Sequence, residues 1–191
     1  DYLRKELEDF SGPLNVRQFE YGQSNPTFLL STGSREWVLR KKPPGKLLPS
    51  AHAVDREYRI IKALKETEVP VPETYLLCED DSIIGTPFYV MNLVEGRIFR
   101  DPTAPELSNN RERSKIFDAM NDTLAKIHAV DWRAAGLADY GKPGNYMGRQ
   151  VSRWTKQYEA SKTDDIESMD RLMDWLPKNI PEDDSTTIAH G

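Results

Sequence analysis

The chain has 191 residues, of which 38% are hydrophobic and 30% are charged, and its formal net charge at pH 7 is -5. This length suffices for one domain or two small lobes with a sizeable core, and the composition is typical of a folded chain. No apolar run approaches the roughly 20 residues of a membrane span, and the acidic balance argues against general nucleic-acid binding. A single cysteine, Cys78, excludes an internal disulfide. It favours an intracellular location, in which the mitochondrial, peroxisomal and cytoplasmic compartments are not distinguished.

The first 95 residues predict a small antiparallel sheet. A short acidic helix over residues 1–10 comes first, and apolar runs bounded by turn residues then predict strands. The apolar face repeated at helical spacing over residues 50–65 predicts one helix, inserted after the third strand. The expected strands are residues 16–20, 27–31, 36–40, 74–78 and 87–93.

Beyond Gly96 the pattern changes from strands to helices. Asn109 or Asn110 can cap a long helix that ends near His128, and two more helices are expected over residues 151–160 and 166–176. Each of the three carries an apolar stripe, and we expect Trp154 to pack. A glycine-rich loop is expected over residues 136–148, and the last six residues are β-like in composition.

A cluster of positive charge interrupts this acidic sequence. Residues 35–62 hold eight cations against three anions, and Arg40 stands at the end of a strand that Pro43, Pro44 and Gly45 break. Adjacent cations repel one another, so a small anion such as phosphate would be favoured there. The alternative is a solvated strand end. By the period of two, Lys41 should point to the opposite face of the strand from Arg40, whereas a role for Lys42 stays open.

Glu57 is the one carboxylate inside the apolar stripe of the inserted helix, between Val54 and Ile61. A buried charge without a partner is too costly to persist, so we expect Glu57 to find a cation or hydrogen-bond donors. A rotated helix would instead place Glu57 on the surface. His128 lies near an apolar helix face and is expected to be structural. The sequence has no metal-ligand spacing typical of zinc and no Gly-x-Ser-x-Gly motif of a hydrolase.

The order of sheet, inserted helix and helical remainder is similar to a protein-kinase-like bilobal fold. Eight motifs in order resemble the aminoglycoside-phosphotransferase and choline-kinase-like superfamily, and more closely the kinase-like domain fused to, or encoded beside, acyl-CoA dehydrogenases. The motifs are GQSNPTF (22–28), WVLRKKPPG (37–45), DRE (55–57), FYVM (88–91), EGRIFRD (95–101), LAKIH (124–128), RQVSRWTKQY (149–158) and IAHG (188–191).

The resemblance implies an α+β fold with two parts. Residues 1–95 would form an N-terminal nucleotide-binding lobe, made of an antiparallel five-stranded sheet with one inserted helix. Residues 96–191 would form part of a helical acceptor lobe, truncated before the catalytic loop.

The resemblance also implies the roles of individual residues. In the family the third strand supplies a cation to the nucleotide phosphates, the inserted helix supplies the carboxylate that pairs with it, and the last strand leads into a hinge whose backbone reads adenine. These roles fall on Arg40, on Glu57, and on Asn92, Leu93 and Val94. Asn92, Leu93 and Val94 are equally compatible with an ordinary strand between the lobes that has no role in binding adenine.

The same resemblance places Gly22, Ser24 and Asn25 in the loop that holds the phosphates. Where a protein kinase has three glycines, this loop has a hydroxyl and an amide, which would share the work of main-chain N–H groups. The cation is also an arginine rather than a lysine, which suits a permanent clamp because arginine can grip two oxygens at once.

His190 and Gly191 correspond to the dipeptide that opens the catalytic loop in the resembled family. There, an Asp that acts as the base follows at once, and an Asn and a further Asp bind magnesium. The resemblance therefore places the base and the metal ligands after residue 191. We expect no catalytic residue within the chain and no phosphoryl transfer by it alone.

The function implied is that of an ATP- and Mg-dependent small-molecule kinase that phosphorylates a hydroxyl group. The implied acceptor is a hydroxyacyl group as its CoA thioester, in fatty acid metabolism, and the implied partner is an attached or neighbouring acyl-CoA dehydrogenase. Two alternatives stay open. One is a non-catalytic nucleotide-binding or docking domain that serves such a dehydrogenase, and the other is an interaction fold in which nothing binds at Arg40.

Overall fold

The computed structural model describes residues 1–20, 24–33, 35–45, 52–182 and 185–189. Gly22, His190 and Gly191 lie outside the described residues, so the expectations for them are untested. The chain separates into two compact units, residues 1–137 and 138–191. The expected lobe boundary after residue 95 falls within the first unit and stays a prediction.

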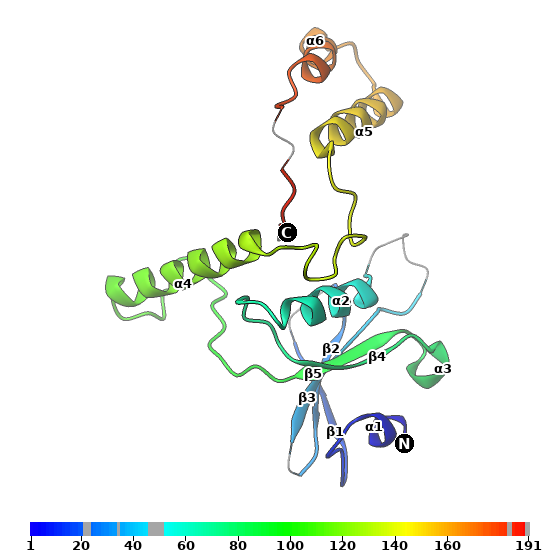
Figure 1. Ribbon diagram of the computed structural model, residues 1–191, viewed down its shortest axis with the longest axis vertical. Coiled ribbons are helices and arrows are strands. Elements are labelled where there is room, and N and C mark those ends of the chain that lie inside the picture. The colour runs from blue at the N-terminus through cyan, green and yellow to red at the C-terminus, as the bar shows by residue number, and fades with distance from the viewer. Residues whose placement is uncertain (21–23, 34, 46–51, 183–184, 190–191) are drawn as a thin grey trace. The chain divides into compact units, whose positions relative to one another are not determined.

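Five strands form a single sheet in the order β1-β2-β3-β5-β4, and every neighbouring pair is antiparallel (Figure 1). The predicted five-stranded antiparallel sheet is confirmed, and its strands begin and end within two residues of the predicted positions. The strands are β1 (Asn15–Gln18), β2 (Thr27–Ser31), β3 (Glu36–Lys41), β4 (Thr74–Cys78) and β5 (Phe88–Asn92).

Each face of the sheet is covered by a different helix (Figure 1). The short α1 (Tyr2–Glu6) and the residues after it cover one face, where Trp37 and Leu39 of β3 point. Alternation along the strand sends Val38 and Arg40 to the opposite face, which α2 (Val54–Leu64) covers. The core on the α1 side consists of Leu7, Phe10, Leu30, Trp37, Leu39, Leu76, Cys78, Phe88 and Val90.

Helix α2 occupies the predicted place between β3 and β4 but begins at Val54, four residues later than the sequence predicts. His52 has a φ of 58°, in the left-handed region that a right-handed helix cannot include. Ala53 then takes the N-cap position and offers no side-chain acceptor to the first turn. The chain therefore enters the helix through a tight turn, in which the Val54 N–H donates to the His52 carbonyl at 2.9 Å.

A one-turn helix, α3 (Asp81–Ile84), lies between β4 and β5, where the sequence analysis predicts no helix. The Asp80 carboxylate accepts from the Ser82 N–H at 2.9 Å, which caps the turn. Hydrogen bonding from the Ser82 side chain, followed by that from its main chain, lowers the pKa of Asp80. Gly85 ends it with a φ of 84°, a conformation that glycine adopts without steric cost.

The remaining helices are present, with shifted boundaries, and they bury little. Asn109 caps α4 by accepting from the Glu112 N–H at 3.0 Å, as predicted, but Phe117 and Met120 of its apolar stripe are exposed. Trp154 of α5 is also exposed, so the expectation that it packs is wrong for the described residues. These helices are α4 (Asn110–Ala129), α5 (Tyr146–Ser161) and α6 (Glu167–Trp175), with a final 3-10 turn η1 (Leu176–Lys178).

Two further expectations for the second unit are wrong. Helix α5 begins at Tyr146, inside the region expected to be a loop. Within it a Cβ on Gly148 would clash with the Asn145 Oδ1, so a larger residue there would require the Asn145 side chain to move. Residues 185–189 form no strand. Among the described residues, no helix combines the length and the apolar character that crossing a membrane requires.

Candidate functional site

The sheet register places three polar side chains side by side on the face that α2 covers. Arg40 of β3 stands directly opposite Thr27 of β2 and directly opposite Tyr89 of β5. Residues that face each other across antiparallel strands project to the same side of the sheet. One rung of the sheet therefore presents a hydroxyl, a guanidinium and a phenol toward Glu57 on α2.

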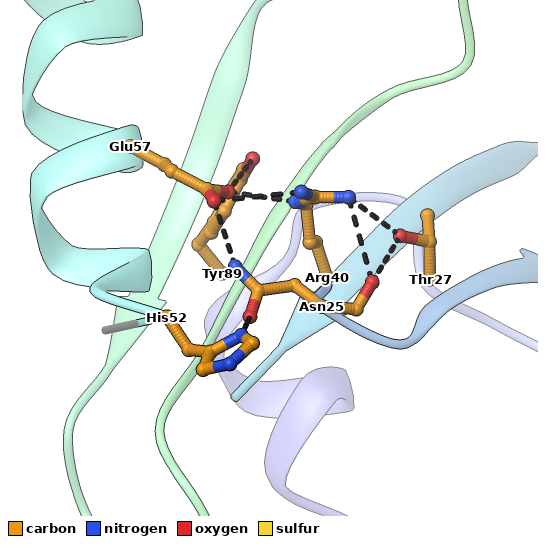
Figure 2. A network of polar contacts seen from close by, with 6 residues as sticks. All are labelled: Asn25, Thr27, Arg40, His52, Glu57 and Tyr89. Carbon is orange, nitrogen blue, oxygen red and sulfur yellow. Dashed lines mark hydrogen bonds and ion pairs between the residues drawn. The ribbon is translucent and has the colours of Figure 1, made fainter. Parts of the chain in front are cut away.

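Arg40 and Glu57 form a two-point ion pair (Figure 2). The Arg40 Nε donates to the Glu57 Oε2 at 2.7 Å, and Nη2 donates to Oε1 at 3.4 Å. The two side chains are 26% and 33% exposed, so the pair is neither fully buried nor fully solvated. The sequence predicts this pairing, and the structure forms it.

The other guanidinium nitrogen of Arg40 points toward β2. Its Nη1 donates to the Thr27 Oγ1 at 3.0 Å and to the Asn25 carbonyl at 3.5 Å, and the Thr27 hydroxyl donates to the same carbonyl at 3.0 Å. A guanidinium has five N–H groups. Since contacts to other described residues use four, they set the orientation of Arg40, and one N–H on Nη2 makes no hydrogen bond within the described residues.

Glu57 is held by more than Arg40. The Asn25 Nδ2 donates to the Glu57 Oε1 at 2.7 Å, and the Tyr89 hydroxyl donates to Oε2 at 3.2 Å. Burial, followed by the nearby charge of Glu57, raises the pKa of Tyr89 above its ordinary range. Tyr89 therefore remains a hydrogen-bond donor to the carboxylate at neutral pH.

Both polar atoms of the Asn25 side chain make a contact inside this network. It is only 1% exposed, and its Oδ1 lies 3.0 Å from the Nδ1 of His52, the residue two positions before α2 (Figure 2). Figure 2 shows the amide of Asn25 between the imidazole of His52 and the carboxylate of Glu57. The residues before β2 and before α2 are thus joined to the ion pair through one amide.

A pocket of about 740 Å³ opens beside Arg40 within the first unit. Apolar side chains, among them Val38, Val71 and Met91, form much of its wall, and Arg40 contributes charge. The pocket also reaches the end of β5 and the residues after it. Its lining is Phe19, Glu20, Thr27, Val38, Arg40, Pro70, Val71, Pro72, Met91, Asn92, Leu93, Val94, Ile98 and Arg100.

The three residues expected to form a hinge line this pocket together with Arg40. The Asn92 main-chain N–H donates to the Glu73 carbonyl at 2.9 Å, and its side-chain oxygen accepts from the Glu73 N–H at 2.7 Å. The main-chain N–H groups of Leu93 and Val94 make no hydrogen bond within the described residues. The main-chain donors beside the pocket are therefore those of Leu93 and Val94 rather than that of Asn92.

The other predicted positions are placed as follows. Ser24 is described and exposed. Lys41 lies on the opposite face of the strand from Arg40, as expected, and its Nζ donates to the Ile84 carbonyl at 3.3 Å. Sequence reasoning missed three members of the network, Thr27, His52 and Tyr89. For Thr27 and Tyr89 the only signal is the strand register, which places both opposite Arg40.

Among the described residues, no group of three or more His, Cys, Asp or Glu side chains could hold a metal ion. The described residues therefore offer a cation, main-chain donors and an apolar wall. Such a set can bind an anionic ligand that carries a flat apolar part.

Comparison with known proteins supports the interpretation of these motifs. A family model described as "Phosphotransferase enzyme family" matches residues 15–191. A crystal structure from Ralstonia eutropha, of a protein assigned as an aminoglycoside phosphotransferase, is 51% identical with a TM-score of 0.79, over 96% of this chain and 53% of that chain. The resemblance predicted from the sequence motifs and the predicted kinase-like α+β fold are both confirmed.

Two relatives show the connection to dehydrogenases. The mouse protein named acyl-CoA dehydrogenase family member 10 is 52% identical over all of this chain, which spans 18% of that relative. The human protein named acyl-CoA dehydrogenase family member 11 is 48% identical over all of this chain, which spans 25% of that relative. The chain thus corresponds to a fifth to a quarter of these larger proteins.

Proposed function

Because this chain belongs to the phosphotransferase enzyme family, we propose that it is the nucleotide-binding part of an ATP-dependent kinase that phosphorylates a hydroxyl group on a small molecule. One observation carries the proposal. Arg40, which is paired with Glu57, lines the same pocket of about 740 Å³ as residues 92–94. A nucleotide needs a cation for its phosphates, a flat apolar slot for its base and main-chain donors at the base edge, and this pocket has all three.

In this proposal Arg40 binds a phosphate oxygen through its remaining Nη2 N–H, while Glu57 and Thr27 keep the guanidinium in place. The Leu93 and Val94 N–H groups face the adenine edge. Asn25, although assigned to phosphate binding from the sequence, acts on Glu57, because its amide is already committed there. Ser24 and Gly22 keep their proposed place in the phosphate loop.

The chemical step moves the γ-phosphoryl group of ATP to the acceptor oxygen. The bond to the β,γ-bridging oxygen breaks, a bond to the acceptor oxygen forms, and the hydroxyl proton passes to a base. Positioning and electrostatics account for most of the rate in such reactions. The described residues of this chain contribute positioning. We propose that the base and the magnesium ligands belong to other parts of the whole protein, and that the chain alone does not transfer a phosphoryl group.

Titration calorimetry of the full-length protein with ATP tests the nucleotide site. We expect the wild-type protein to bind ATP, and Arg40→Ala to weaken binding by about tenfold or more, as loss of a charge-assisted hydrogen bond predicts. Lys41→Ala is the matched control, because this neighbouring cation lies on the other face of β3 and should leave the affinity unchanged. Unchanged affinity in Arg40→Ala would remove the arginine from the phosphate site.

For the acceptor we propose a hydroxyacyl-CoA thioester. The support is the naming of the longer relatives as acyl-CoA dehydrogenase family members. Incubating the full-length protein with ATP and either a hydroxyacyl-CoA or the free hydroxy acid, followed by mass spectrometry, compares the two. A phosphoester formed from the thioester alone is the expected result. Equal phosphorylation of the free acid would contradict the CoA assignment.

A second candidate is a nucleotide-binding or docking domain without catalytic activity, attached to a dehydrogenase. It rests on the same ion pair and pocket, which could bind a nucleotide without a base or a metal site beside them. ATP binding by the full-length protein, with no turnover of any hydroxylated acceptor in the presence of Mg²⁺, would favour this candidate over the kinase.

A further inference from the structure

His52 joins the network from a position that no sequence motif marks. It lies between β3 and α2, and its Nδ1 is 3.0 Å from the Asn25 Oδ1 (Figure 2). Asn25 is almost fully buried, so its amide has little access to water and depends on protein partners. His52 is the partner that satisfies its oxygen.

Glu57 fixes the direction of the hydrogen bonds that connect His52, Asn25 and Glu57. At neutral pH a carboxylate can only accept, so the atom of Asn25 that faces the Glu57 Oε1 at 2.7 Å must be the NH₂ group. The Asn25 Oδ1 is therefore the atom that faces His52, and it needs a donor. The His52 Nδ1 must carry a proton, as it does in one neutral tautomer and in the imidazolium.

The backbone at His52 adds a second, independent observation. Its φ of 58° is uncommon for a residue other than glycine, and such conformations persist where the surroundings hold them. Helix α2 starts directly afterwards, and its N-cap residue, Ala53, makes no side-chain cap. The imidazole contact therefore links a helix start without a side-chain cap to Asn25, two residues before β2.

Glu57 lies in the first turn and a half of α2, so its carboxylate moves with the start of the helix. A shift of that turn would lengthen the bonds from Glu57 to Arg40, whose orientation depends on them. Contacts of this kind, outside a binding site, often set how tightly the primary residues are held.

We propose that His52 is a positioning residue for the nucleotide site. Its Nδ1–H holds the Asn25 amide in place and keeps the first turn of α2 in position, so that Glu57 holds Arg40 toward the phosphates. The proposal rests on the proposed nucleotide site. His52 itself contacts no ligand in this arrangement.

Two substitutions of His52 that differ by one methylene test the geometry. In His52→Asn the side-chain NH₂ can occupy the place of Nδ1–H, whereas in His52→Gln the NH₂ corresponds to the more distant Nε2. His52→Leu removes the donor, and His128→Leu, at an exposed histidine on α4, is the control for histidine loss. The ATP dissociation constant and the hydrogen exchange of residues 53–60 are measured for each variant in the full-length protein.

We expect His52→Leu and His52→Gln to weaken ATP binding about three- to tenfold, the factor for one lost hydrogen bond, and to speed exchange at the start of α2. His52→Asn should stay within about twofold of the wild type, and His128→Leu should match it. Near-wild-type binding in His52→Asn would show that a donor at the position of Nδ1–H is what matters, rather than the loss of the histidine as such. If His52→Leu does not fold, the comparison of Asn with Gln still decides.

Wild-type behaviour in both His52→Leu and His52→Gln would overturn the proposal, and so would equal damage in Asn and Gln. A wild-type protein that does not bind ATP would instead contradict the proposed function. Exchange at residues 53–60 would then still report whether His52 holds the start of α2, so the two failures are distinguishable.

Discussion

Replacing Glu57 by glutamine removes the charge at the centre of the network while keeping the shape of the side chain. The two carboxylate oxygens accept from four donor groups. Oε2 receives the Arg40 Nε at 2.7 Å and the Tyr89 hydroxyl at 3.2 Å, and Oε1 receives the Asn25 Nδ2 at 2.7 Å and the Arg40 Nη2 at 3.4 Å. A glutamine amide has one oxygen, so one pair of donors would face an NH₂ group.

The expected loss of stability follows from these contacts. Hydrogen bonds to charged groups contribute about 1.5–3 kcal/mol each, and removing one partner of a fully buried pair costs about 3–5 kcal/mol. The pair is a quarter to a third exposed, so solvent reduces the second figure. If the Asn25 side-chain amide flipped, its oxygen could accept from the new NH₂ group, but this would replace a charge-assisted hydrogen bond by a neutral one. We therefore expect the free energy of unfolding of the sheet to fall by ~2–3 kcal/mol.

Hydrogen exchange of the β3 and β5 amides, measured against urea concentration, reports the opening free energy of this sheet inside a larger protein. Glu73→Gln is the matched control. The Glu73 carboxylate also pairs with a cation, Lys65 at 2.5 Å, and accepts from a tyrosine hydroxyl, Tyr75 at 3.3 Å. Both side chains of this pair are about half exposed, so its removal should cost clearly less.

Equal losses in Glu57→Gln and Glu73→Gln would refute the reasoning, because they would mean that Glu57 behaves as a surface carboxylate. A loss below about 0.5 kcal/mol in Glu57→Gln, the range of exposed ion pairs, would refute it as well. The urea dependence should be the same in all variants, since the surface exposed on opening is unchanged.

Three further predictions concern neighbouring residues. Arg40→Lys keeps the charge but can no longer donate to Glu57 through two nitrogens and to Thr27 as well, so calorimetry should give an ATP affinity between those of the wild type and Arg40→Ala. The pKa of Tyr89 is raised in the folded state by burial and by Glu57. The protonated Tyr89 hydroxyl therefore contributes its full stabilisation below the ordinary tyrosine pKa of about 10, and this stabilisation is lost as the pH rises through the pKa of the folded state. The opening free energy of the sheet, measured by hydrogen exchange, should fall at alkaline pH in the wild type. In Tyr89→Phe the part of this fall that comes from Tyr89 ionisation should be missing. Trp37 is 1% exposed, so Trp37→Ala should lower the opening free energy of the sheet by about 3–5 kcal/mol, whereas the same substitution at Trp154, which is 57% exposed, should leave it nearly unchanged. A comparable loss at both tryptophans would contradict the placement of the core.

The sequence by itself determined the elements whose pattern is local. Apolar runs bounded by turn residues predicted the five strands. Helical spacing predicted α2 with Glu57 on its inner face, because side-chain direction repeats every 3.6 residues in a helix. The family resemblance named Arg40 as the partner of Glu57, and the period of two placed Lys41 on the other side of the strand.

Only the tertiary structure decided what surrounds that ion pair. Thr27 and Tyr89 join Arg40 because the strands pair in one register, and a slip of one residue would turn their side chains to the other face. Asn25 and His52 meet across 27 positions of sequence, at a distance that depends on where β2 and α2 begin. Local periodicity carries no information about such contacts, which is why the sequence predicted the central pair, whereas the residues that hold it in place became visible only in the folded chain.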